Sequence, residues 1–216
     1  MATTHATYRP LRLAVLISGG GSTLANLIER IRDGRLRGAE IRLVISSRRA
    51  VRGVEIAREA GLPVEIIRPI DFADDQAFSE AITAAIDKAE IDLVVMGGFM
   101  RFWRLPPRYE GRVLNIHPAL LPRFGGQGMH GEHVHAAVLA AGERETGCTV
   151  HLVDLQYDHG PIIAQRCVPV LPQDTAETLA HRVQSAEREL YPEIIQSIVD
   201  RGLAWLRSAA RAQDRH

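Results

Sequence analysis

The segment Asn115-Ile116-His117-Pro118 holds the residues best suited to chemistry. Asn115 and His117 are two positions apart at the end of an apolar run, so both would point to the same side of a strand. An Asn amide can donate to an oxygen that gains negative charge, and a His can carry a proton near neutral pH. Ligands bind at the carboxyl ends of strands in open α/β sheets, so the pair indicates a candidate active site. A polar pair with a structural role only is the alternative.

The loop at residues 157–161, YDHGP, supplies a carboxylate, Asp158, that could pair with His117. A neighbouring negative charge favours the imidazolium form, whereas burial of the ring disfavours it. Because the loop is polar, we expect it to be solvated and the carboxylate to dominate. The sequence therefore predicts that the pKa of His117 lies above the ordinary value of about 6.5.

A glycine-rich turn at residues 18–22, SGGGS, separates an apolar run from a helical pattern. Such a turn presents backbone N–H groups at a helix N-terminus, where phosphate binds. The hydroxyls of Ser22 and Thr23 favour a phosphate site. The turn lacks both the GxGxxG pattern and the lysine of a P-loop, so a tight turn without a ligand is the alternative.

Other reactive side chains are given structural interpretations. No His, Cys or carboxylate spacing matches a zinc site, so surface or helix-capping roles are expected for four histidines: His130, His133, His135 and His151. Both cysteines, Cys148 and Cys167, fall in strands and are expected to be buried. Phe99, Phe102 and Trp103 fit either an aromatic pocket or the core.

These residues must be positioned by a single α/β domain. The chain of 216 residues is 46% hydrophobic and carries 26 basic and 26 acidic side chains, which argues against disorder and against a broad basic face for nucleic acid. No apolar run reaches the length of a membrane span, and we expect a cytoplasmic location. We assign the domain to 11–206, with a loose lead at 1–10 and a frayed tail at 207–216.

Alternating strand and helix patterns predict a mostly parallel, twisted sheet flanked by helices. A helix is expected to begin after Asp74 or Asp75, and another to occupy 175–201 with a break or kink after Tyr191, caused by Pro192. Strands are expected at 12–17, 41–46, 64–67, 91–100, 113–116, 148–153 and 162–170, and further helices near 24–31, 51–60 and 134–141; the helix capped at Asp74 or Asp75 is marked by apolar residues at 78, 82 and 86.

Five segments occur in the order typical of one family: SGGGST, GGFMRFW, GRVLNIHPALLPRFGG, CTVHLVD…YDHGPII and RVQSAERELYP. The chain resembles the phosphoribosylglycinamide formyltransferases, folate-dependent enzymes of purine synthesis, over about residues 11–202. The resemblance implies a Rossmann-like formyltransferase fold. It implies formyl transfer from 10-formyltetrahydrofolate to the amine of glycinamide ribonucleotide, without a metal, by a monomer or homodimer.

The same resemblance assigns roles to individual residues. Asn115 and His117 match the catalytic pair, and Asp158 matches the carboxylate that organises it. The substrate-binding positions are Gly21, Ser22, Thr23 and Glu187, and the folate-binding positions are Met100, Arg101, Phe102, Trp103 and Asn115.

The chain also departs from the family pattern. Gly20 and Thr23 replace Asn residues frequent in the glycine-rich turn, and Asp75 stands where a family Arg can contact folate. The loop GGQGMHGEHVH is richer in glycine than the usual PGLHTH form. We therefore expect the contacts of the phosphate and of this loop to differ in detail from the family pattern.

Other activities remain open at the level of sequence. A methionyl-tRNA formyltransferase would carry an added RNA-binding domain, and a formyltetrahydrofolate hydrolase an added N-terminal domain. A sugar-nucleotide N-formyltransferase that uses the same donor is harder to exclude. A silent module that binds phosphate or folate is the non-enzymatic alternative, although it would not need Asn115, His117 and Asp158 together.

Overall fold

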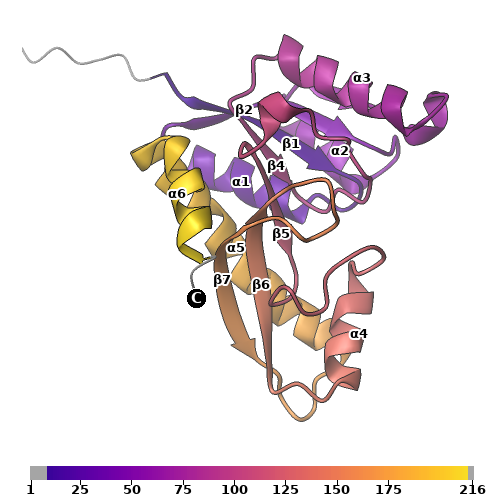
Figure 1. The fold of residues 1–216 in the computed structure, drawn as a ribbon, viewed down its shortest axis with the longest axis vertical. Helices are drawn as coiled ribbons and strands as arrows, with labels where there is room; N and C mark the ends of the chain where they lie inside the picture. The colour runs from indigo at the N-terminus through magenta and orange to yellow at the C-terminus, as the bar shows by residue number, and fades with distance from the viewer. Residues whose placement is uncertain (1–8, 214–216) are drawn as a thin grey trace, which may run out of the picture.

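The computed structural model describes residues 9–213 and contains a seven-stranded sheet with helices on both faces (Figure 1). The strand order is β3-β2-β1-β4-β5-β6-β7. Pairing is parallel from β3 to β5, whereas β6 is antiparallel to both β5 and β7. The predicted mostly parallel α/β sheet is therefore confirmed. The strands are β1 (Leu11–Ile17), β2 (Ala39–Ser46), β3 (Val64–Ile66), β4 (Leu93–Met96), β5 (Val113–His117), β6 (Glu145–Leu152) and β7 (Ile162–Pro169).

The helices begin and end close to the predicted positions. Asp74 caps one of them by accepting a hydrogen bond from the backbone N–H of Ala77 at 2.8 Å, as the sequence predicted. The α-helices are α1 (Ser22–Arg32), α2 (Arg52–Glu59), α3 (Asp75–Lys88), α4 (Glu132–Ala140), α5 (Ala176–Arg201) and α6 (Ala204–Gln213), and two 3₁₀ turns occupy Pro69–Asp71 and Pro107–Tyr109.

Both faces of the sheet are buried, which explains the apolar runs in the parallel strands. Along β1, Leu13 and Val15 pack into the core formed with α1 and α5. Ala14 and Leu16 pack into the opposite core, which α3 covers with side chains such as Phe78. The alternation fixes the register of β1, and thus the position of the glycine-rich turn that follows it.

Helix α5 does not break at Pro192, so the first of the two expected effects of the proline does not occur. It continues to Arg201 with the proline buried inside it. Pro192 lacks the N–H that would bond the carbonyl of Arg188, four residues earlier. The side chain of Asn26 on α1 donates to that same carbonyl at 2.8 Å. A tertiary contact therefore satisfies the carbonyl that the proline leaves free.

Two further sequence predictions differ from the structure. The segment expected to fray after residue 206 forms α6, which buries Leu206 and Ala210 against the rest of the protein. Cys148 is buried as expected, but Cys167 is exposed because alternate residues of β7 face solvent. The predicted loose lead lies largely outside the described residues, as do residues 214–216. Within residues 9–213, no helix is long and apolar enough to cross a membrane.

The site lies where the direction of strand addition reverses. The sheet grows from β1 toward β3 in one direction, and from β1 through β4 to β7 in the other. Ligands bind at such a switch point, beyond the carboxyl ends of the strands. Strand β4 ends at Met96, earlier than the predicted 91–100, so the following residues leave the sheet and border this edge.

Candidate active site

A pocket of about 780 Å³ opens beyond the carboxyl ends of β1, β4 and β5. This volume is in the range of small-molecule sites. The walls combine the glycine-rich turn after β1, the loop after β4, Asn115 to Pro118 at the end of β5, residues 126–132 with His135 of α4, the loop between β6 and β7 at Tyr157 and Asp158, and one face of α5. Six separate segments of the chain thus surround one cavity.

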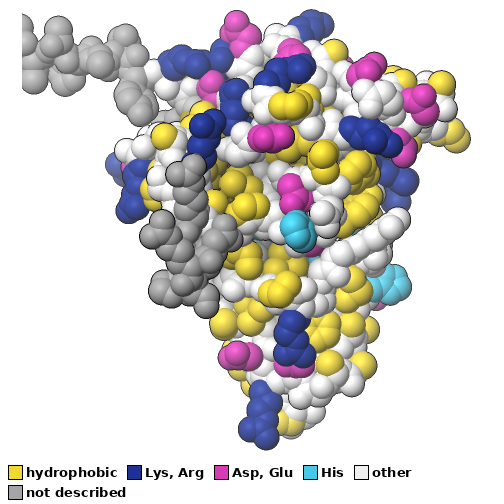
Figure 2. Space-filling view, viewed as in Figure 1, with side chains coloured by type: hydrophobic (Ala, Val, Ile, Leu, Met, Phe, Trp, Pro, Cys, Tyr) yellow, Lys and Arg dark blue, Asp and Glu magenta, His cyan; other side chains and the backbone are white. Residues whose placement is uncertain are grey.

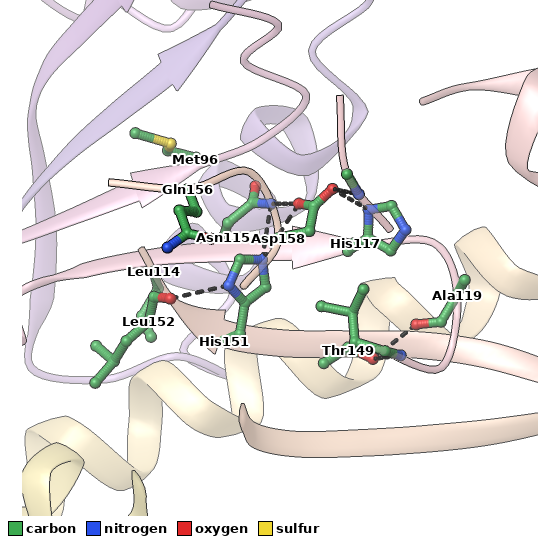
Figure 3. Close-up of polar contacts among 12 residues, drawn as sticks. Met96, Leu114, Asn115, His117, Ala119, Thr149, His151, Leu152, Gln156 and Asp158 are labelled. Atoms are coloured by element: carbon green, nitrogen blue, oxygen red, sulfur yellow. Dashed lines mark hydrogen bonds and ion pairs between the residues drawn. The ribbon is translucent and has the colours of Figure 1, made fainter. Parts of the chain in front are cut away.

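Asn115, His117 and Asp158 meet at this pocket, as the sequence could not show. Asp158 Oδ2 lies 3.4 Å from His117 Nδ1, and Asp158 Oδ1 lies 3.4 Å from Asn115 Nδ2. Figure 3 shows the carboxylate between the two side chains, with His151 below Asn115. We call these four residues the polar cluster.

Both ring nitrogens of His117 face oxygen atoms. Nε2 is 2.8 Å from the carbonyl oxygen of Phe124, which can only accept, so the structure favours a hydrogen on Nε2. Burial lowers the pKa of His117 below its ordinary value, although Asp158 and the Phe124 carbonyl act in the opposite direction. The predicted upward shift is wrong because the surroundings are not solvated: the His117 and Asp158 side chains are only 3% and 12% exposed.

Asp158 is held in place by its backbone and by its contacts. It adopts a positive φ of 53°, which Asp and Asn tolerate better than most residues. Its Oδ2 accepts a hydrogen bond from the backbone N–H of Gly126 at 3.0 Å. Burial acts to raise the pKa of Asp158, but the neighbouring His117 and the hydrogen bond from the Gly126 N–H act in the opposite direction, and the pKa is lowered. Asp158 therefore stays negatively charged at neutral pH.

The glycine-rich turn fits the predicted anion site. Gly21 caps α1 with φ 73°, and a Cβ atom there would lie 2.5 Å from the Gly53 Cα atom. Only glycine allows this conformation and this approach of two backbone segments. The turn and the first residues of α1, Ser22 and Thr23, all border the pocket. Gln184 of α5 joins them, since its Nε2 donates to Ser22 Oγ at 3.4 Å.

Glu187 of α5 also borders the pocket, and burial raises its pKa to about 7, with only a partial counter-effect from Arg188. The position assigned by resemblance thus lies with the glycine-rich turn around one cavity. A carboxyl group in this state can accept hydrogen bonds from hydroxyls of a ligand when ionised.

Relative to the original protein, Glu187→Gln should have a higher free energy of unfolding at pH 8, and this gain should be smaller at pH 5. The raised pKa means that the folded state binds more protons than the unfolded state between about pH 4.5 and 7, so the contribution of Glu187 to stability falls as the pH rises through this window. Glutamine stays neutral and does not lose this stability, so the variant should gain at most about 3 kcal/mol in the free energy of unfolding at pH 8. Urea unfolding of both proteins at pH 5 and pH 8 measures the difference. An identical pH dependence in the two proteins would contradict the raised pKa.

The segment assigned to folate divides between pocket and core. Met100 and Arg101 border the pocket. Trp103 is 2% exposed and donates from Nε1 to Thr83 Oγ1 at 3.1 Å, so it belongs to the core. Phe102 is not among the pocket residues, but its ring lies 5.5 Å from that of Tyr157, which is. The structure therefore places two of the four directly at the cavity.

Two of the four histidines expected at the surface are buried. His130 and His133 are exposed, but His135 and His151 are 4% and 2% exposed. His135 borders the pocket with an Nδ1 atom that has no hydrogen-bond partner. His151 lies on β6, where every residue from Thr146 to Leu152 is buried, and the mostly apolar run CTVHLV around it is the signal in the sequence for its burial. Among residues 9–213, no three His, Cys, Asp or Glu side chains are grouped as metal ligands would be.

The fold and the pocket define an α/β protein in which a helix N-terminus, suited to an anionic group, shares one pocket with Asn115, His117 and Asp158. Comparison with known proteins identifies it more closely. A family model described as formyl transferase matches residues 11–195, and the chain belongs to this family. The resemblance noted in the sequence is thereby confirmed.

The similar proteins named below are phosphoribosylglycinamide formyltransferases, also called glycinamide ribonucleotide transformylases. The chain is 44% identical over 197 residues to a phosphoribosylglycinamide formyltransferase of Mycobacterium tuberculosis, covering 90% of this chain and 87% of the relative. It is 39% identical over 204 residues to a chloroplastic phosphoribosylglycinamide formyltransferase of Vigna unguiculata, covering 93% of this chain. The crystal structure of glycinamide ribonucleotide transformylase 1 from Symbiobacterium toebii superimposes with a TM-score of 0.83 at 36% identity, covering 93% of this chain and 92% of that one.

The relatives differ in length. The chain spans 65% of the chloroplastic relative and 14% of a Drosophila melanogaster protein named as a trifunctional purine biosynthetic protein, to which it is 41% identical.

Proposed function

We propose that this protein transfers a formyl group from 10-formyltetrahydrofolate to the primary amine of glycinamide ribonucleotide, in the synthesis of purines. The observation that carries the proposal is the single pocket that joins the glycine-rich turn to Asn115, His117 and Asp158. A substrate with a phosphate at one end and an amine at the other would extend along this pocket, with its phosphate at the glycine-rich turn and its amine beside the three side chains.

The reaction requires that negative charge be stabilised on the formyl oxygen as the amine attacks the formyl carbon. Asn115 is the donor in position, because its side chain lies at the end of β5 on the pocket wall. Donors fixed in advance in a site with little water stabilise such charge strongly.

His117 would accept the proton that the amine loses. Its lowered pKa leaves the ring largely neutral at pH 7, and Nδ1 is then the free acceptor, because Nε2 donates to the Phe124 carbonyl. Once protonated, the ring is held between that carbonyl and Asp158, and its charge stabilises the oxyanion. The proton then passes to the folate nitrogen that releases the formyl group.

The folate donor would enter beside the loop after β4. Met100 and Tyr157 are 40% and 42% exposed at the pocket, which is unusual for large hydrophobic side chains and suits the flat rings of a folate. Arg101 lies near Tyr157 and offers a positive charge to the acidic end of the donor.

The phosphate of the acceptor would lie on the glycine-rich turn, at the N-terminus of α1. Ser22→Ala should therefore raise the KM for glycinamide ribonucleotide about tenfold, the scale of one lost hydrogen bond to a charged group, and lower kcat little. Steady-state kinetics with each substrate varied in turn measures this. Ser185→Ala, on the exposed side of α5, is the matched control. An equal rise in both KM values would argue against a phosphate site here.

The activity itself is tested by combining the purified protein, 10-formyltetrahydrofolate and one amine at a time, and by following the deformylated folate. Glycinamide ribonucleotide, an amino-sugar nucleotide and no amine are the three arms. Transfer in the first arm alone supports the proposal, with the formylated product verified by mass. Transfer only to the amino-sugar nucleotide would identify a different formyltransferase, and equal turnover without amine would identify a hydrolase.

A further inference from the structure

His151 lies directly behind Asn115. It sits on β6, where it is the antiparallel partner of Asn115 on β5. Its side chain is 2% exposed and is not among the residues that border the pocket. His151 therefore has no access to a ligand, and any effect on the reaction must pass through its neighbours.

The partners of the two ring nitrogens define the hydrogen positions on His151. Nδ1 is 2.9 Å from the carbonyl oxygen of Leu152, which can only accept, so Nδ1 carries a hydrogen. Nε2 is 3.1 Å from Asn115 Nδ2, which can only donate, so Nε2 presents a lone pair. Both dashed contacts are visible in Figure 3. Asp158 Oδ1, at 3.6 Å from Nε2, is beyond hydrogen-bond distance.

This arrangement fixes the carboxamide of Asn115. One N–H of the side chain is used by His151, and the other has only the long 3.4 Å contact with Asp158. Rotating the carboxamide by 180° would place its oxygen against the Nε2 lone pair and the Asp158 carboxylate, both of which are acceptors. The orientation seen is therefore the one that the surroundings allow, and the weakly bonded N–H is the one left for a ligand.

We propose that His151 is a positioning residue for formyl transfer: its Nε2 atom anchors one N–H of Asn115 so that the other is held ready for the formyl oxygen. The proposal rests on the role of Asn115 in the proposed function. It assigns to a buried strand residue the orientation of a group that touches the substrate.

Two substitutions test the role of Nε2 apart from that of Nδ1. In His151→Gln, the glutamine Oε1 atom reaches the position of Nε2 and can accept a hydrogen bond from Asn115. In His151→Asn, the shorter side chain reaches only the position of Nδ1. We expect His151→Asn to lower kcat by roughly 10- to 100-fold, the effect of one lost orienting bond, with both KM values within about threefold of the original. His151→Gln should retain most of the turnover.

Two readouts distinguish positioning from a structural role. In NMR spectra, the Asn115 side-chain amide should give two resolved, sharp hydrogen signals in the original protein and in His151→Gln, and exchange-broadened signals in His151→Asn. In a double-mutant cycle, adding His151→Asn to Asn115→Ala should cost no further turnover.

Equal losses in the Gln and Asn variants, or additive losses in the double variant, would overturn the proposal. The NMR readout needs no turnover, so a failure of the proposed activity is recognised separately from a failure of the positioning role.

Discussion

Asn115→Ala and His117→Ala are each expected to lower kcat by roughly 100- to 1,000-fold, the cost of removing one group that stabilises an oxyanion. In the proposed reaction, Asn115 supplies the N–H that faces the developing charge, and His117 supplies the proton acceptor and the positive charge that follows. Single-turnover formyl transfer, with glycinamide ribonucleotide as acceptor, measures the chemical step directly.

The matched control for the histidine is His159→Ala. His159 is exposed, pairs with Asp154 and lies outside the pocket, so its loss should leave kcat unchanged. Thermal unfolding should show that all variants are folded. Turnover near the original value in either Asn115→Ala or His117→Ala would remove that residue from the mechanism.

Asp158→Asn is expected to lower kcat by roughly 100- to 10,000-fold, the range seen when the carboxylate that supports a catalytic imidazole becomes an amide. Asparagine tolerates the positive φ and can still accept from Gly126, so the substitution removes the charge and little else. Without that charge, burial acts on His117 unopposed by the carboxylate. The pKa of His117 should therefore fall further below its ordinary value.

An NMR titration of His117 in both proteins measures that shift. Asp154→Asn is the control, because Asp154 lies in the same loop but pairs with the exposed His159. It should change neither the pKa of His117 nor the turnover. An unchanged pKa in Asp158→Asn would reduce Asp158 to a residue that only shapes the loop.

Charges of both signs are mixed in this protein. On the face shown in Figure 2, basic and acidic side chains are interspersed over the exposed surface, with hydrophobic side chains between them. The chain as a whole has equal numbers of basic and acidic residues. Ligand recognition is therefore expected from local groups, namely the helix N-terminus, Glu187 and the polar cluster, rather than from a broad field.

Local patterns in the sequence were sufficient for the order of the strands and helices from β1 to α5. Apolar runs and helical spacing depend on which side chains face the core, and the cap at Asp74 depends on neighbours three residues away. Motifs also located the glycine-rich turn and Asn115 with His117, because both are continuous in sequence. These features are set by interactions within a few residues, which is why they can be recognised without the fold.

Several features required contacts between distant segments. The continuity of α5 through Pro192 depends on Asn26, far away in the chain, and the burial of α6 depends on its packing against the core. Phe102 and Trp103 fitted two interpretations until the packing of Trp103 on Thr83 was seen.

The polar cluster shows the division most clearly. The sequence by itself determined the α/β scaffold and singled out Asn115, His117 and Asp158 as the candidate site residues. The tertiary structure decided how they work together: it buried His117 enough to lower its pKa, brought Asp158 to within 3.4 Å, and placed His151 behind Asn115 through strand pairing. Burial and hydrogen-bond partners are properties of the surroundings, and residues from six separate segments create those surroundings here.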